Sequence, residues 1–200
     1  MTPPPCRLYV LPAAAAPTAV IMRRGPSAWW HLLTWDLEAG ELTPGAWLRG
    51  MLYPERSAVS PDGKLLGYFA LGHGRHPWDT YFAVSKVPWL TALAAWHTHG
   101  TWTGGCAFAA DNSLTISASM DKRPFHGRYP YGVTVGNLPP TLPGAAGTAR
   151  DHQGRLLVAT DQGEVKIVEE RSGARVTIWS RDLNGLTPDP APSPRWARAW

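Results

Sequence analysis

Glycine and proline together make up one residue in five of this chain, with 20 of each among its 200 residues. Glycine takes up backbone conformations with positive φ, and proline removes a backbone donor, so both interrupt regular structure. Between them lie short apolar runs, several with β-branched and aromatic residues. The chain is therefore expected to lack long helices and to form many short strands joined by turns.

The composition is that of a folded chain. Hydrophobic residues make up 44% of the sequence and charged residues only 17%, which excludes a mainly disordered protein. No apolar run approaches the roughly 18–20 residues that a membrane-spanning helix needs. Two hundred residues suit one well-buried domain, so we expect a single domain over residues 1–200, with a proline-rich C-terminal tail over 187–200.

Three segments of the chain repeat one pattern, in which a short strand, a polar turn and an apolar strand follow one another. They are Ser57–Ala70, Cys106–Ser117 and Thr148–Thr160. Gly63 and Gly154, and Asn112 or Ser113, supply turn positions that favour positive φ. The repeats are spaced by 49 and 42 residues, from Asp62 to Asp111 and from there to Gln153. Periods in the forties are typical of four-stranded blades.

The predicted fold is an all-β, small or partial β-propeller-like array. About fifteen expected strands correspond to about four antiparallel blades. Such blades could form a closed ring, a ring of three and a half blades closed by the strand Arg7–Leu11, or an open array completed by a second copy at a bare sheet edge. The segment Pro88–His97 fits a helix or a strand, and a strand over Leu90–Trp96 agrees better with the repeats.

Two segments resemble a known family. Thr34–Glu41 (TWDLEAGE) looks like the Trp-Asp strand and turn of a WD40-type blade, and Ser60–Leu66 (SPDGKLL) is similar to the first hairpin of WD40 and TolB-like blades. No Gly-His dipeptide lies at the matching distance before Trp35. The resemblance therefore implies propeller-like β architecture and not membership of a particular functional family.

Tryptophan is unusually abundant, with 11 residues. Indole rings are large enough to fill the spaces between twisted sheets, so most are expected to pack between blades. Trp78 and Trp102 follow loop-like segments, and Asp79 is the one acid that turn formation does not account for. We predict that Trp78, Trp102 and Asp79 lie at a ligand-facing rim.

Histidines suggest a metal site. His73 and His76 lie in one loop, while His97 and His99 flank Thr98 and would face the same side of an extended strand. Neutral imidazole binds zinc and nickel, so these four residues are the predicted metal ligands. No HExxH motif accompanies them, and the alternative is that they are ordinary solvated loop residues.

Charge and cysteine content limit the classes of binding partner and the disulfide bridges that we expect. The net charge is +4, and the basic residues are scattered, with only Arg23 and Arg24 adjacent among the arginines. This favours a solvated basic surface and argues against nucleic-acid binding. Two cysteines, Cys6 and Cys106, exclude a disulfide framework and leave a single bridge open. The N-terminus lacks the pattern of a signal peptide, so a cytoplasmic location is expected.

The predicted function is that of a non-enzymatic binding or scaffold domain. We expect a protein or a small polar ligand as partner, possible self-association to a homo-oligomer, no membrane or nucleic-acid binding, and no cofactor, since the sequence has no P-loop or GxSxG motif. Two alternatives stay open: a carbohydrate-binding lectin that uses tryptophan rims, and a metal-dependent hydrolase at the histidines.

Overall fold

The chain folds almost entirely into β-strands. The computed structural model describes residues 4–72, 76–128, 135–137 and 148–200, the last-but-one range as backbone only. These residues form sixteen strands and two 3₁₀ turns, with no α-helix among them. The all-β prediction is confirmed, and the described helical segments are far too short to traverse a bilayer.

The strands form three sheets. The first sheet has the order β1-β2-β3-β4, the middle sheet has β12-β10-β9-β8-β7-β5 with β6 on β7 and β11 on β9, and the C-terminal sheet has β13-β14-β15-β16. The first sheet comprises β1 (Arg7–Pro12), β2 (Thr18–Arg24), β3 (Trp29–Asp36) and β4 (Leu42–Arg49). The middle sheet comprises β5 (Met51–Leu52), β6 (Ala58–Val59), β7 (Leu65–Leu71), β8 (Thr80–Lys86), β9 (Ala94–Phe108), β10 (Leu114–Met120), β11 (His126–Gly127) and β12 (Val135–Asn137). The C-terminal sheet comprises β13 (Thr148–Arg150), β14 (Leu156–Ala159), β15 (Glu164–Arg171) and β16 (Ala174–Asp182). Among the described residues, all strand pairings are antiparallel except that of β10 with β12.

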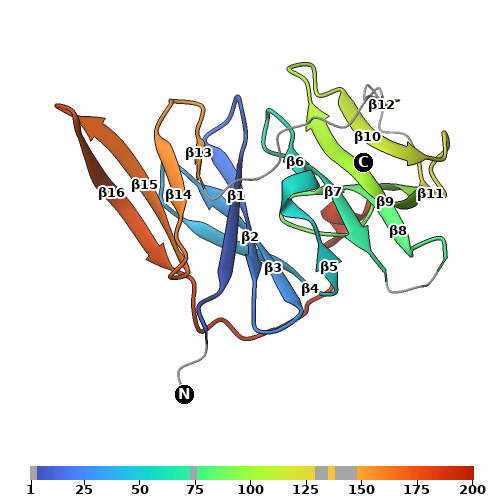
Figure 1. The fold of residues 1–200 in the computed structure, drawn as a ribbon, viewed down its shortest axis with the longest axis horizontal. Coiled ribbons are helices and arrows are strands. Elements are labelled where there is room, and N and C mark those ends of the chain that lie inside the picture. Colours follow the sequence, from blue (N-terminus) through green and yellow to red (C-terminus); the bar gives the residue numbers. More distant parts are fainter. Residues whose placement is uncertain (1–3, 73–75, 129–134, 138–147) are drawn as a thin grey trace.

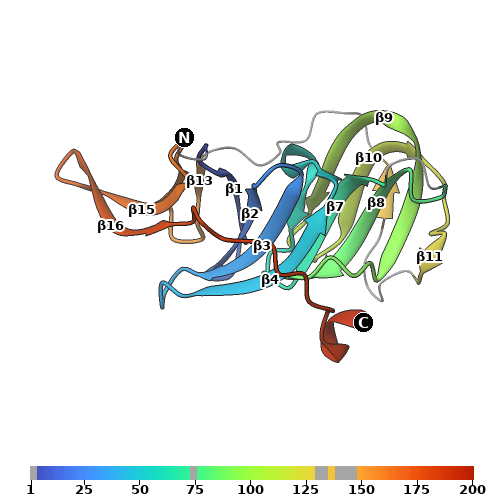
Figure 2. The same cartoon turned by 90° about the horizontal axis from the view of Figure 1, so that it is seen from below.

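The sheets lie beside one another (Figures 1 and 2). In space the first sheet lies between the C-terminal sheet and the middle sheet, which is named for its place along the chain. Strand β2 explains this central position of the first sheet. Its apolar residues are buried on both faces, as in a sheet that is covered on each side. Ile21 belongs to a core shared with Val165 of the C-terminal sheet. Met22 belongs to a second core shared with Tyr68 of the middle sheet.

The middle sheet curls on itself at β9, a strand of 15 residues. The first part of β9 pairs with β8, and its last part pairs with β10. Phe82 and Trp96 on one side of the bend share a third core with Cys106 and Leu114 on the other. This curl brings together the start of β8, residues 97–99 of β9 and the end of β10.

The three repeated hairpins form as the sequence predicts. Their turns contain Gly63 at φ 75°, Asn112 at φ 62° and Gly154 at φ 81°. In each turn an aspartate accepts a hydrogen bond from the backbone N–H two residues later, with donors Lys64, Ser113 and Gln153. The carboxylates of Asp62, Asp111 and Asp151 therefore stabilise these turns.

Two details differ from expectation. Strand β9 begins at Ala94, so the preceding residues from Pro88 are neither strand nor helix. The N–H of Leu93, just before the strand, donates a hydrogen bond to the carbonyl of Val84 at 2.7 Å. Strand β1 pairs with β2, from Arg7↔Arg24 to Pro12↔Ala19. It therefore belongs to the first sheet, and the alternative of an N-terminal strand that completes the last sheet is wrong.

Residues 183–200 form a C-terminal strap that runs from the C-terminal sheet past β3 and β4 towards β8 (Figure 2). It ends in the 3₁₀ turn Arg195–Arg198. Lys86 Nζ donates to the carbonyl of Trp196 at 3.0 Å, and Thr91 Oγ1 lies 2.6 Å from Ser193 Oγ. The proline-rich tail is thus an extended segment that joins the outer sheets.

Burial of the tryptophans and cysteines agrees in part with expectation. Trp30 and Trp35 are fully buried between sheets, and Trp96 is fully buried inside the curled middle sheet. Trp102, Trp196 and Trp200 are exposed. Cys6 and Cys106 are both buried and free, so the bridge left open above does not form.

Candidate metal centre

Antiparallel pairing of β8 with β9 builds the centre of the site. Tyr81 is opposite His97 in this pair, and Asp79 immediately precedes β8. The carbonyl of Asp79 accepts a hydrogen bond from the N–H of Gly72 at 3.0 Å, which holds the entry to β8 against the end of β7. His76 lies in the turn before Asp79, so one short segment supplies both an imidazole and a carboxylate facing His97.

The neighbouring strand adds a second carboxylate. His97 and His99 are two residues apart on β9, and their ring centroids lie 5.9 Å apart. Thr98 between them is fully buried, as alternation along a strand requires. The N–H of Asp121, just after β10, donates to the carbonyl of His97 at 3.2 Å. This backbone contact fixes Asp121 beside the two histidines.

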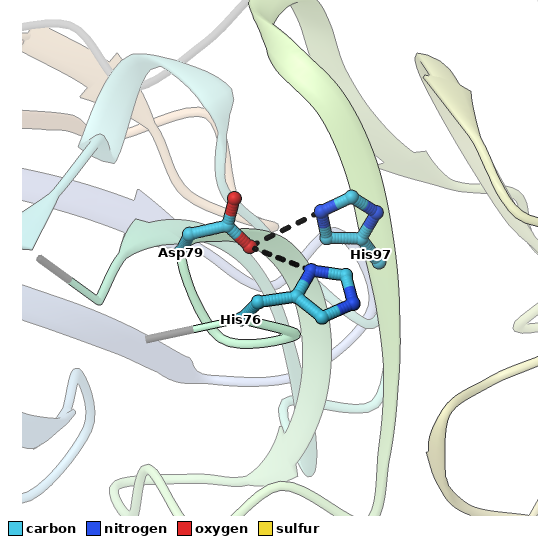
Figure 3. A group of neighbouring side chains, drawn as sticks. All are labelled: His76, Asp79 and His97. Atoms are coloured by element: carbon cyan, nitrogen blue, oxygen red, sulfur yellow. Dashed lines mark ion pairs between the residues drawn. The ribbon is translucent and has the colours of Figure 1, made fainter. Parts of the chain in front are cut away.

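Two overlapping groups of ligating side chains result, which we name the inner triad (His76, Asp79 and His97) and the outer triad (His97, His99 and Asp121). In the inner triad, Oδ1 of Asp79 lies 3.1 Å from His97 Nε2 and 3.7 Å from His76 Nδ1. Figure 3 shows this single oxygen facing both rings. One ligating atom from each residue of a triad lies within 4.8 Å of the others.

The outer triad is connected differently. Nε2 of His99 lies 3.1 Å from Asp121 Oδ1, and the Nδ1 atom of the same ring lies 3.2 Å from Ser119 Oγ. His97 Nδ1 lies 3.9 Å from Asp121 Oδ2, too long for a hydrogen bond. The side chain of His97 is only 17% exposed, against 54% for His99 and 55% for Asp121.

Asp79 has the unusual environment. Its Oδ1 atom is buried and accepts no hydrogen bond within the part of the chain that the structure describes. Partial burial acts to raise the pKa of Asp79, but the nearby backbone N–H groups of Asp79 and Thr80 and the rings of His97 and His76 outweigh it, so the pKa lies below its usual value. The carboxyl group is therefore ionised at neutral pH, and its Oδ1 atom faces an imidazole nitrogen of His97 and one of His76.

No known protein family, curated protein or solved structure matches this chain.

The spacing of the inner triad suits a transition-metal ion. An ion bound at about 2.0–2.1 Å from each of three tetrahedrally placed donors holds those donors about 3.3 Å apart. The contact between Asp79 and His97 is already close to that spacing, and the contact between Asp79 and His76 exceeds it by a few tenths of an ångström. His76 is 76% exposed, so its ring is free to make the remaining movement.

The structure brings together three of the four predicted metal ligands, namely His76, His97 and His99, and adds Asp79 to them. His73 lies outside the described residues. The sequence analysis did not identify Asp121, although it predicted the hairpin that contains the start of β10, the strand that ends just before this residue.

The predicted aromatic rim is not formed by its two tryptophans together. Trp78 is half-buried and packs edge-on against Tyr81 and Phe125, with ring centroids 4.9 and 4.7 Å away. Trp102 is 96% exposed and makes no ring contact in the described part of the chain. Trp78 thus supports the wall beside Asp79, and Trp102 stands by itself on the surface.

Proposed function

We propose that this protein is a non-enzymatic binding protein that holds a divalent transition-metal ion at the inner triad. The observation that carries the proposal is the buried Oδ1 atom of Asp79, which faces two imidazole nitrogens and accepts no hydrogen bond from the described chain. Burial of an unsatisfied carboxylate oxygen is unfavourable. Coordination of a cation shared with His76 and His97 removes that penalty.

The donor set favours a particular class of ion. Two imidazole nitrogens and one carboxylate oxygen suit zinc, cobalt, nickel or ferrous iron. Calcium and magnesium prefer shells made of oxygen alone, so they are expected to bind poorly here.

We further infer that the supporting scaffold is an open, propeller-like array of four blades. Successive meanders along the chain support this inference, since β1–β4, β6 to the first part of β9, the last part of β9 with β10, and β13–β16 follow one another in order. The C-terminal sheet and the β9–β10 ribbon lie at opposite ends of the array in both views (Figures 1 and 2). Binding of a protein partner or of a second copy at an exposed edge stays a prediction.

Metal binding by the full-length, tag-free chain tests the proposal. After treatment with a chelator and its removal, titration with Zn²⁺ followed by calorimetry is expected to show a saturable site. Asp79→Ala and His97→Ala each remove one of three protein donors, so each is expected to weaken binding by at least about 100-fold, a larger effect than loss of a residue that only supports a ligand.

His152→Ala is the matched control, because His152 lies in the turn after β13, outside both triads. It is expected to bind Zn²⁺ as the unmodified chain does. Equal affinity of Asp79→Ala and the unmodified chain would refute the proposal, as would the absence of saturable binding. Circular dichroism of each variant checks that its strands are intact.

A metal-dependent hydrolase is the second candidate, and the number of donors is the observation that favours it. Three protein ligands leave a coordination position for water, as in catalytic zinc sites. Hydrolysis of an activated ester or phosphodiester that requires Zn²⁺ and is lost in Asp79→Ala would favour the enzyme over the binding protein.

A further inference from the structure

We infer that the two triads together bind one ion, at Asp79, and that Asp121 with His99 is a positioning pair that fixes the His97 ring. The five side chains form an alternating row, His76–Asp79–His97–Asp121–His99, in which both nitrogens of His97 face a carboxylate. This inference rests on the proposed function, because it concerns how the same site is filled.

Stoichiometry follows from the chemistry of imidazole. A neutral imidazole carries a proton on one nitrogen and a lone pair on the other. His97 belongs to both triads, with Nε2 facing Asp79 and Nδ1 facing Asp121. It therefore ligates an ion on one side only, and its other nitrogen donates a hydrogen bond.

Hydrogen bonds of His99 decide which side takes the ion. The hydroxyl of Ser119 reaches Nδ1 of His99 and a carboxylate oxygen of Asp121 reaches Nε2. A carboxylate only accepts, so Nε2 carries the proton and Nδ1 accepts from Ser119. His99 then has no lone pair free for a metal, whereas Oδ1 of Asp79 accepts no hydrogen bond within the described chain.

The remaining role of Asp121 is to orient His97. With an ion on Nε2, the proton of His97 resides on Nδ1 and points to Asp121 Oδ2, which is 3.9 Å away. A shift of about 1 Å completes that hydrogen bond. Asp121 is held in place by the hydrogen bond from its backbone N–H to the carbonyl of His97 and by the contact of its Oδ1 with His99. Carboxylate partners of this kind fix the tautomer of a ligating histidine and raise metal affinity 10–100-fold.

The experiment is a comparison of Asp121→Asn with Asp79→Ala in Zn²⁺ titrations and in the visible absorption spectrum of bound Co²⁺. The unmodified chain is expected to bind one ion per molecule. Asp121→Asn is expected to bind one ion about 10–100-fold more weakly, with the Co²⁺ band positions unchanged because the same donor atoms remain. Asp121→Glu is expected to recover part of the affinity.

Asp111→Asn serves as the matched control, since Asp111 is an exposed turn carboxylate. Three results would overturn the inference while leaving the proposed function intact: two ions per molecule, unchanged affinity in Asp121→Asn, or a loss in Asp121→Asn as complete as in Asp79→Ala with altered Co²⁺ bands. Failure of the unmodified chain to bind Zn²⁺ would instead refute the proposed function itself, and the inference with it.

Discussion

Replacement of Arg23 by methionine is expected to lower the free energy of unfolding by about 3–4 kcal/mol, because its guanidinium group holds the C-terminal strap by charge-assisted hydrogen bonds. Arg23 is only 2% exposed. Its Nε donates to the carbonyl of Leu183 at 2.7 Å, Nη1 to that of Gly25 at 2.5 Å, and Nη2 to that of Leu186 at 3.3 Å. Methionine replaces the aliphatic part of the arginine side chain but donates to none of these carbonyls.

Urea denaturation followed by tryptophan fluorescence measures this loss, and limited proteolysis reports whether the strap detaches. Arg24→Met is the matched control. Arg24 is half-buried and its guanidinium group lies 5.6 Å from the centre of the Trp30 ring, so its loss is expected to remove less than about 1 kcal/mol. Similar unfolding free energies for the two variants would show that Arg23 does not anchor the strap.

Arg23 also illustrates what the sequence does not reveal. Adjacent arginines in a mildly basic chain indicate a solvated surface, and this interpretation is wrong for Arg23. In β2, Arg23 points to the same face as Ile21, and the strap then covers it. Residues 183–186 are distant in sequence, and no local pattern connects their carbonyls to a guanidinium group about 160 positions earlier.

Local features of the fold, by contrast, can be predicted from the sequence because they depend on residues that are close together along the chain. The hairpins at Gly63, Asn112 and Gly154 depend on turn residues and on the apolar strands beside them, all within about a dozen positions. The same locality explains why His97 and His99 were paired correctly, since alternation in one strand puts them on one face.

Asp121 shows where such reasoning ends. The β9–β10 hairpin keeps one register from Leu114↔Phe108 to Ser117↔Gly105, and then shifts, so that Met120 is opposite Thr98. Continued without shifts, that register would place Asp121 opposite Thr101, away from His97. The extra residues of β9 that cause the shift follow from packing at the bend, and single-sequence patterns do not encode their number. The site therefore depends on a bulge as much as on its ligands.

Acidification is expected to destabilise the protein through His31. This residue is 4% exposed, and its ring stacks on Trp47 with centroids 4.0 Å apart and planes 5° from parallel. Neither ring nitrogen has a hydrogen-bond partner in the described chain. Burial, and then the charge of Arg23, lower the pKa of His31 from 6.5 to about 4. The neutral ring is therefore the form that the fold accommodates.

The sign of the effect follows from proton linkage. Above pH 6.5 His31 is neutral in both folded and unfolded chains, and its contribution to stability is complete. Between pH 6.5 and pH 4 the unfolded chain binds a proton that the folded chain does not, so stability falls. At about 1.36 kcal/mol per pKa unit, the loss reaches about 2 kcal/mol at pH 5 and about 3 kcal/mol below pH 4.

His31→Phe isolates this contribution, because phenylalanine preserves the stacking on Trp47 and does not titrate. At pH 7 the variant is expected to be at least as stable as the unmodified chain, since it removes two buried nitrogens without partners. In urea denaturation at pH 7, 6 and 5, the stability advantage of His31→Phe should grow by about 2 kcal/mol. An advantage that stays constant over this range would mean that His31 is not held neutral by the fold. The Asp62 and Asp111 carboxyls, whose pKa values are lowered in the fold, lose their stabilising charge only as the pH falls through those lowered values, so the range from pH 7 to pH 5 separates the histidine from the acids.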